Sequence, residues 1–175
     1  MLVVAATERE LALLEGVDTF CCGIGPVEAA IQTARVIEER RPDAVLHVGI
    51  AGALGIEPPA LVLGSEAVYC DLAAEIPTVN RSFPDAALLE RARGALADAL
   101  VLPIGTSAAV GGGSCDVEAM EGFGVLRACE LAGVPAVELR AISNAIGEPD
   151  RAKWRFDEAF AALAGAVERV LSSAS

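Results

Sequence analysis

Short apolar runs of strand length alternate along the chain with segments whose apolar residues recur at helical spacing. The segment from residue 26 to 40 is typical, since Val27, Ala30 and Ile31 follow the period of an α-helix. Strands that alternate with helices build a mainly parallel sheet with helices on both faces. We therefore expect an α/β fold of three layers, α/β/α, with a mainly parallel, mixed central sheet and a single domain over residues 1–175.

Glycines, prolines and the apolar runs together place the expected elements. In such sheets, binding sites form beyond the carboxyl ends of the strands. Polar or glycine-rich junctions occur there at Glu10, 49–52, Thr106–Ser107 and Ser143–Asn144. We expect strands at residues 1–6, 18–23, 42–52, 61–72, at the start of 101–110, and at 134–143, with helices at residues 8–16, 25–40, 84–100, 122–133 and 150–171.

Charge and cysteine content argue against several kinds of partner. The net charge is −12 with only 13 basic residues, which disfavours nucleic acid and anionic membranes. No apolar run approaches the ~18 residues that span a bilayer, and the opening MLVV is too short for a signal sequence, so we expect a cytoplasmic protein. Five cysteines without a CxxC pair, and a single histidine, His47, do not predict a zinc site. Free thiols are expected, and a Cys–His nucleophile with His47 is the weaker alternative.

Three polar side chains stand where apolar segments end. Glu10 lies one turn into the first helix, where the helix dipole also favours a solvated acid. Glu121 lies in the apolar stretch AMEGF, and a buried carboxylate needs hydrogen bonds, from two vicinal sugar hydroxyls or from its own helix. Asn144 ends the run AVELRAISN, where an amide can read a ring by accepting and donating, or can simply make a turn.

Two glycine motifs accompany these side chains. The turn from Gly23 to Pro26 opens a helix, which can hold an anion or a ribose hydroxyl but is equally an ordinary tight turn. The segment from Gly49 to Gly52 lets the backbone approach a ligand closely, or is a plain exit from a strand.

Several segments occur together and in a fixed order: Glu10 after the first strand, CCGIGPVEAAI, VLHVGIAGAL, VEAMEGFGVLRACELAGVP and VELRAISNAIG. In this combination the chain resembles the purine nucleoside phosphorylase and nucleosidase superfamily. A DLAAE-like stretch from Asp71 to Glu75 and a GxxDRxxW-like stretch from Gly147 to Trp154 resemble its futalosine hydrolase branch. The resemblance implies a nucleoside phosphorylase-like fold, a small-molecule nucleoside substrate, no metal or organic cofactor, and a homo-oligomer, commonly a dimer.

The resemblance also implies roles for individual residues. Glu10 matches the acid that positions and deprotonates the attacking water. Glu121, after Met120, matches the acid that holds the ribose 2′ and 3′ hydroxyls. Asn144 occupies the position of the side chain that reads the purine. In adenine-specific nucleosidases, the residue at that position looks like Asp. The expected site residues are thus Glu10 and Asn144 for catalysis, with Glu121, Met120, Gly52, Ile50, Phe123 and Trp154 for substrate binding.

An amide at residue 144 favours a 6-oxopurine leaving group. A charged Asp would repel the O6 atom, whereas Asn144 offers N–H to O6 or N7 and C=O to N1–H. Asn144 cannot supply a proton, so protonation of N7 would need water. The resemblance therefore implies hydrolysis of futalosine to hypoxanthine and dehypoxanthine futalosine, in the futalosine route to menaquinone. A methylthioadenosine/S-adenosylhomocysteine-type nucleosidase or a purine nucleoside phosphorylase remains the alternative.

Water is favoured over phosphate as the nucleophile. A phosphorylase needs cations or amide nests around inorganic phosphate, and the turn from Gly23 to Gly25 carries no Arg or Lys. Arg9 lies beside Glu10, but neighbouring side chains on a helix diverge. Ile50 stands where relatives often carry Ser or Thr, which removes a polar group near the ribose.

The chain departs from the family pattern in two loops. It lacks the usual hairpin between Gly16 and Gly23, and it is short between Ser107 and Asp116, where relatives carry a base-stacking aromatic. The glycines at 111–113 replace that segment, so Phe123, Trp154 or Phe156 would have to stack on the base. The short loops also leave open that a partner subunit completes the pocket, or that the substrate differs.

Overall fold

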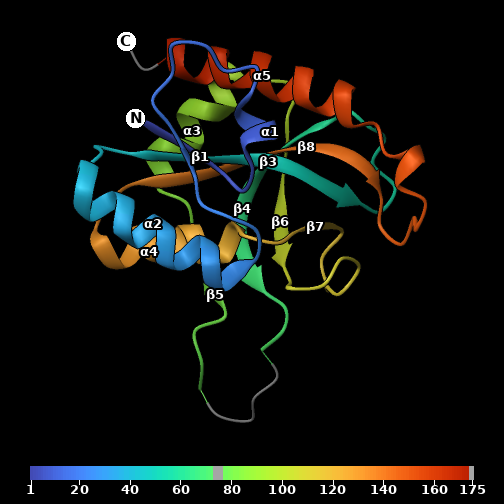
Figure 1. The fold of residues 1–175 in the computed structure, drawn as a ribbon, viewed down its shortest axis with the longest axis horizontal. Helices are drawn as coiled ribbons and strands as arrows, with labels where there is room; N and C mark the ends of the chain where they lie inside the picture. Colours follow the sequence, from blue (N-terminus) through green and yellow to red (C-terminus); the bar gives the residue numbers. More distant parts are fainter. Residues whose placement is uncertain (73–76, 174–175) are drawn as a thin grey trace.

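The structure is a computed structural model that describes residues 1–72 and 77–173. Strands and helices alternate along most of the chain (Figure 1). The strands are β1 (Leu2–Ala5), β2 (Thr19–Cys21), β3 (Val45–Ala53), β4 (Leu61–Tyr69), β5 (Arg81–Ser82), β6 (Leu100–Thr106), β7 (Val117–Ala119) and β8 (Ala136–Ala145). The helices are α1 (Glu8–Leu11), α2 (Pro26–Arg40), α3 (Ala86–Ala95), α4 (Gly122–Ala132) and α5 (Phe156–Ser172), with a 3₁₀ helix η1 (Arg151–Lys153).

The strands form one mixed sheet in the order β2-β1-β3-β7-β6-β4-β5, and β8 pairs with both β3 and β4. The pairs β1–β2, β1–β3, β3–β8, β4–β6 and β6–β7 are parallel, whereas β3–β7, β4–β5 and β4–β8 are antiparallel. Because β8 bridges β3 and β4, the strands β3, β8, β4, β6 and β7 close into a ring. The expected mainly parallel, mixed sheet is confirmed, and the ring is a feature that alternation of elements alone did not predict.

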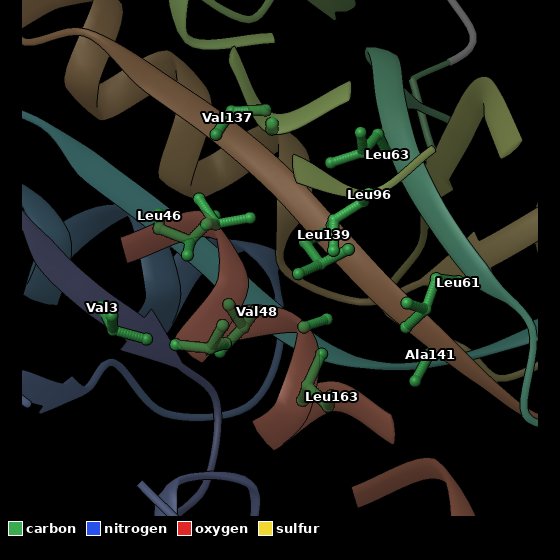
Figure 2. Packing of buried hydrophobic residues seen from close by; sticks show 14 of the residues in the cluster. Val3, Leu46, Val48, Leu61, Leu63, Leu96, Val137, Leu139, Ala141 and Leu163 are labelled. Carbon is green, nitrogen blue, oxygen red and sulfur yellow. The ribbon is translucent and has the colours of Figure 1, made fainter. Parts of the chain in front are cut away.

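Helices cover both faces of the sheet, as expected. Helices α1, α3 and α5 lie on one face, and α2 and α4 lie side by side on the other (Figure 1). Successive side chains of β1 point to opposite faces of the sheet and so enter two different cores. Val3 belongs to the core under α3 and α5, which Figure 2 shows from close by, together with Leu46 and Leu163. Leu2 belongs to the core against α2 and α4.

Element boundaries differ from the expected ones at three helices. Helix α3 spans Ala86–Ala95 rather than residues 84–100. The final helix begins at Phe156 rather than at residue 150, because Asp150 accepts from Ala152 N and caps the separate helix η1. The N–H of Arg155 then donates to the carbonyl of Ser143, which ties this segment to the end of β8. The first helix is only Glu8–Leu11 rather than residues 8–16. The short strands β5 and β7 were not predicted, since two or three residues carry too little periodicity.

Two further observations concern the chain as a whole. All five cysteines are unpaired thiols, as predicted. Across residues 1–72 and 77–173, none of the helices is both long enough and apolar enough to traverse a bilayer.

Candidate active site

A cavity of about 350 Å³ opens where β3 and β8 end. Its wall is built from α1, the ends of β3 and β8, residues 109–111, residues 118–121, and the segment around η1 and the start of α5. The cavity therefore lies at the carboxyl ends of parallel strands, the edge at which the sequence predicted a site.

The carboxylate of Glu10 accepts three hydrogen bonds, two from Thr7 and one from Ile50. It lies at the third position of α1, and a capping box joins it to Thr7: Thr7 N and Thr7 Oγ1 donate to Glu10 Oε2 over 3.0 and 2.9 Å. The N–H of Ile50 on β3 donates to Glu10 Oε1 over 3.1 Å. The side chain is 9% exposed and lines the cavity. It is therefore a fixed, buried carboxylate rather than a solvated first-turn acid.

Glu121 is the N-cap residue of α4, but its side chain makes no capping hydrogen bond. Its Oε1 instead accepts from Gly25 N over 3.1 Å, and its Oε2 lies 3.6 Å from Arg140 Nη2. Gly25 has φ +93°, a conformation that suits glycine and turns its N–H toward the carboxylate. Burial raises the pKa of Glu121, although Arg140 and the Gly25 N–H oppose that rise. The capping alternative is excluded, and a desolvated carboxylate faces the cavity.

A buried arginine lies beside Glu121 and a further carboxylate, Glu138. Arg140 on β8 is 1% exposed and donates from Nε to Glu138 Oε1 over 2.8 Å. Residues 138 and 140 share one face of the strand, since side chains alternate. Burial disfavours the charged guanidinium, but Glu138 and Glu121 outweigh burial and hold the pKa of Arg140 above its usual value. Glu138 is fully buried, its Oε2 has no partner among the described residues, and burial raises its pKa.

His47 completes this network. Arg140 Nη2 lies 2.5 Å from His47 Nε2, and His47 Nδ1 lies 3.1 Å from the carbonyl of Val4. Burial, followed by the positive charge of Arg140, lowers the pKa of His47 well below its usual value. The histidine is thus a neutral acceptor for the arginine, and the suggested Cys–His nucleophile has no support from these contacts.

Glycine at residue 49 makes room for this arrangement. A Cβ atom there would overlap Arg140 Nη1 and would lie 2.7 Å from Glu10 Oε1. Gly52, near the end of the same strand, leaves room for the side chain of Asn144, since a Cβ atom at residue 52 would lie 3.0 Å from Asn144 Nδ2. The glycines of the segment 49–52 therefore admit neighbouring side chains as well as a ligand.

Asn144 lies within β8 and is 6% exposed at the wall of the cavity. Its Oδ1 accepts from Ser143 Oγ over 2.7 Å, and its Nδ2 donates to the carbonyl of Ala145 over 2.9 Å. The carbonyl of Ala145 can only accept, so these contacts fix the orientation of the amide. One N–H and one lone pair of Asn144 remain for a ligand. The alternative of a turn residue does not apply.

Of the remaining residues expected to bind substrate, all but Phe123 line the cavity. Met120, Gly52, Ile50 and Trp154 line the cavity, and so does Phe156. Phe123 is not part of the lining: its ring stacks on Tyr69 with centroids 5.2 Å apart.

The short loop after β6 also lines the cavity. Residues 109–111 contribute to the wall, and Asp71 anchors the start of the loop by accepting from Ser107 Oγ and Ala108 N, both over 2.7 Å. This gives Asp71, the first residue of the DLAAE-like stretch, a structural role. Residues 73–75 of that stretch lie outside the described residues.

Arg140, Glu138 and His47 are the residues that the reasoning from sequence did not assign to the site. Two charged residues at positions i and i+2 of an otherwise apolar strand could have indicated a buried ion pair. The finished arrangement offers a fixed carboxylate for proton abstraction, a second carboxylate for hydroxyl groups or positive charge, and an amide for a polar ring, all beside an apolar wall.

Comparisons with known proteins show which family the chain resembles. A family model described as "Phosphorylase superfamily" matches residues 15–174. A futalosine hydrolase of Streptomyces coelicolor is 36% identical over 188 residues, which cover 90% of this chain and 80% of that protein. A futalosine hydrolase of Thermus thermophilus is 34% identical, covering 86% of this chain and 79% of that protein.

The fold is also that of solved nucleosidases. The 5′-methylthioadenosine/S-adenosylhomocysteine nucleosidase of Colwellia psychrerythraea, solved in complex with adenine, matches with a TM-score of 0.86 and 20% identity. The match covers 98% of this chain and 94% of that one. The chain therefore has the nucleoside phosphorylase-like fold.

Proposed function

Because the chain belongs to the phosphorylase superfamily, as an N-glycosyl hydrolase of the nucleosidase type, we propose that it hydrolyses futalosine to hypoxanthine and dehypoxanthine futalosine. The reaction would serve the futalosine route to menaquinone. The observation that carries the choice of substrate is the amide of Asn144, fixed by Ser143 and Ala145 with one donor and one acceptor left over. Two relatives named futalosine hydrolases, at 36% and 34% identity, support the same choice.

The leaving base is assigned to Asn144. Its remaining N–H would donate to O6 or N7 of a 6-oxopurine, where negative charge develops as the glycosidic bond breaks. An ionised Asp in its place would face both O6 and the carbonyl of Ala145, which already lies 2.9 Å from the amide nitrogen. Two repulsions would then replace two hydrogen bonds. The proton for N7 would come from water, since an amide cannot supply it.

The sugar is assigned to Glu121. Its carboxylate would accept from the 2′ and 3′ hydroxyls, and its negative charge would stabilise the positive charge that develops on the ribose. Arg140 and the Gly25 N–H hold the carboxylate in place, and both favour its ionised form against desolvation. These two contacts oppose the effect of burial, which raises the pKa of Glu121.

Water is assigned as the nucleophile, with Glu10 as its base. General base catalysis of this kind typically contributes roughly 10²- to 10⁴-fold. The hydrogen bonds from Thr7 and Ile50 fix the direction of the carboxylate. Inorganic phosphate would need a free cation beside it. Arg140 is engaged by Glu138 and Glu121 and is therefore not available for phosphate, and the guanidinium of Arg9 lies over the rings of Phe156 and Phe160 on the wall of the cavity.

The test is an incubation of purified protein with futalosine, inosine and methylthioadenosine, with and without phosphate, in which the released base is identified by chromatography. We expect hypoxanthine from futalosine at a rate that phosphate does not change. Release should be lost in Glu10→Gln and in Glu121→Gln, and kept in Glu168→Gln, a change on the exposed side of α5.

Other outcomes select other functions. Adenine from methylthioadenosine, without hypoxanthine from futalosine, would contradict the role given to Asn144. A rate that rises with phosphate would make the protein a phosphorylase. Release that survives Glu10→Gln unchanged would remove Glu10 from the mechanism.

A further inference from the structure

One wall of the cavity is an aromatic belt with an arginine at each end. The belt consists of Trp154, Phe156 and Phe160, whose ring centroids lie 5.5 Å apart for the first pair and 6.1 Å for the second. The guanidinium of Arg151 lies 5.5 Å from the ring centroid of Trp154. The guanidinium of Arg9 lies 5.0 Å from the centroids of both Phe156 and Phe160. All five side chains line the same cavity.

The two arginines are only lightly engaged. Arg9 has an ion pair with Asp157 at 3.6 Å, and both side chains are largely exposed, at 61% and 98%, so this pair is weak. For Arg151, the described part of the chain provides no carboxylate within ion-pair distance. Arg155, by contrast, is committed to Glu158 and to the carbonyl of Pro58. In a chain of net charge −12, two available cations on one apolar wall indicate an anionic ligand.

The belt lies beside the reacting groups without belonging to them. Arg9 precedes Glu10 on α1, and Arg155 N binds the carbonyl of Ser143, next to Asn144. A nucleoside with its base at Asn144 and its 2′ and 3′ hydroxyls at Glu121 has one substituent left to direct elsewhere. That substituent is the one on the 5′ carbon.

We propose that Arg9, Arg151 and the aromatic belt form a subsite for a 5′ substituent that ends in a carboxylate. This inference rests on the proposed nucleosidase function. An apolar or aryl spacer would pack on the rings of Trp154 and Phe156, and the carboxylate would pair with a guanidinium that the rings already orient. Futalosine, whose 5′ side chain ends in an aryl carboxylate, belongs to this class, and methylthioadenosine does not.

The experiment compares two nucleosides that differ only in this charge. The pair is 5′-deoxy-5′-(3-carboxyphenylthio)inosine and its 3-carbamoyl analogue, each also prepared on adenosine. Steady-state kinetics are measured for wild type, Arg9→Gln, Arg151→Gln, Arg9→Lys, and the control Arg35→Gln, a change at an exposed cation on α2. None of these changes removes a residue assigned to the reacting atoms.

We expect Arg9→Gln or Arg151→Gln to raise KM for the acid roughly 5- to 30-fold, because such a contact ranges from an exposed ion pair to a charge-assisted hydrogen bond. The value of kcat should stay within about twofold of wild type. KM for the carboxamide should stay within about twofold, and Arg9→Lys should retain part of the preference for the acid. Higher salt should erase that preference in wild type. Arg35→Gln should behave as wild type.

Equal losses on the acid and the carboxamide would overturn the proposal, since the arginines would then serve folding or the shape of the pocket. A wild type that does not prefer the acid would overturn it as well. Failure of the proposed function has a different signature, in which the adenosine pair is cleaved and the inosine pair is not. The carboxylate and the carboxamide can still be compared with each other on inosine or on adenosine, whichever nucleoside the enzyme cleaves.

Discussion

Arg140 Nη2 lies 2.5 Å from His47 Nε2, and this contact determines where the single histidine carries its proton. A guanidinium only donates, so Nε2 must accept, and the proton sits on Nδ1, which donates to the carbonyl of Val4 over 3.1 Å. A second proton on His47 would face Arg140 at hydrogen-bond distance. The folded protein therefore holds His47 neutral, with a pKa well below the usual value.

A pH dependence of stability follows from this contact. Below about pH 6.5 the unfolded chain protonates His47 and the folded chain does not, so the free energy of unfolding falls as pH falls through that window. The slope is at most about 1.4 kcal/mol per pH unit for one group. We expect His47→Gln to lack this slope when urea unfolding is compared at pH 7.5, 6.5 and 5.5.

The comparison with His47→Gln isolates the histidine because the chain has only one. Glu121 and Glu138 have raised pKa values, so the folded state binds their protons more tightly and their contribution runs the other way with pH. That contribution is present in both proteins and cancels in the difference. Parallel pH profiles for the two proteins would contradict the neutral state assigned to His47 in the folded protein.

Glu10→Gln should abolish turnover while leaving the protein folded. A glutamine at the third helical position can still complete the capping box with Thr7, but its amide nitrogen cannot accept from Ile50 N, so we expect a modest fall in the melting temperature. The loss of a general base should lower kcat roughly 10²- to 10⁴-fold. Glu8→Gln, two positions earlier on the exposed side of α1, is the matched control and should keep its activity. A large fall in melting temperature for Glu10→Gln would make its inactivity uninformative about catalysis, and Glu10→Asp, which keeps the charge, would then be compared for partial rescue.

Asn144→Asp should change which base leaves. An ionised carboxylate there loses the hydrogen bond to the carbonyl of Ala145 and meets the O6 atom of a 6-oxopurine. We expect kcat/KM for release of hypoxanthine to fall roughly 10- to 100-fold, the cost of one or two polar contacts in a dry site. Release of adenine from methylthioadenosine should fall less or rise. Equal losses for both bases would mean that residue 144 does not read the 6 position.

Gly49→Ala should disrupt the site from within the sheet. The added methyl would overlap Arg140 Nη1 and approach Glu10 Oε1 to 2.7 Å, so one buried charged group must move. We expect a loss of roughly 2 kcal/mol or more in the free energy of unfolding, together with loss of turnover. Gly165→Ala, inside α5 with nothing within 4 Å of the new methyl, should instead stabilise by roughly 0.5 to 1 kcal/mol. Similar effects of the two changes would show that Arg140 tolerates displacement.

The exposed face of α2 should pair with a second copy of the chain. Val27 and Ile31 are 67% and 60% exposed on this face, and Ile24, just before the helix, is 62% exposed and also lines the cavity. We propose that the protein is a homo-oligomer through this face. Light scattering should give at least twice the chain mass of 17.9 kDa, and Val27→Asp should reduce it to one chain. A wild type that scatters as a single chain would reject this interface.

The sequence predicted the parts of the fold that depend on local patterns. The apolar period of residues 26–40 predicted α2, and the ends of the apolar runs placed Glu10, Glu121 and Asn144 at the junctions of expected elements. The structure brings these three side chains to one cavity. The ring of strands was not predictable, because β8 pairs with β4 through residues such as Val62 and Arg140 that lie far apart in the sequence, and no local pattern encodes that pairing.

The buried network escaped prediction for a related reason. Glu138 and Arg140 look out of place in an apolar strand, but their partners, His47 and Glu121, come from other elements. The placement of Phe123 depends on Tyr69, whose ring comes from β4 and stacks on it. In each case a contact between distant segments decides where the side chain goes, and a single sequence does not display such contacts.

The closed ring of strands has a consequence for how this protein can change over time. Arg140 and Asn144 stand on β8, a strand of the ring, whereas residues 109–111 and the segment around η1 lie outside its strands. Insertions, deletions and substitutions in those segments can alter the wall of the cavity without disturbing Arg140. A lineage built on this scaffold can therefore acquire a new substrate by rewriting its loops while it inherits the chemistry unchanged.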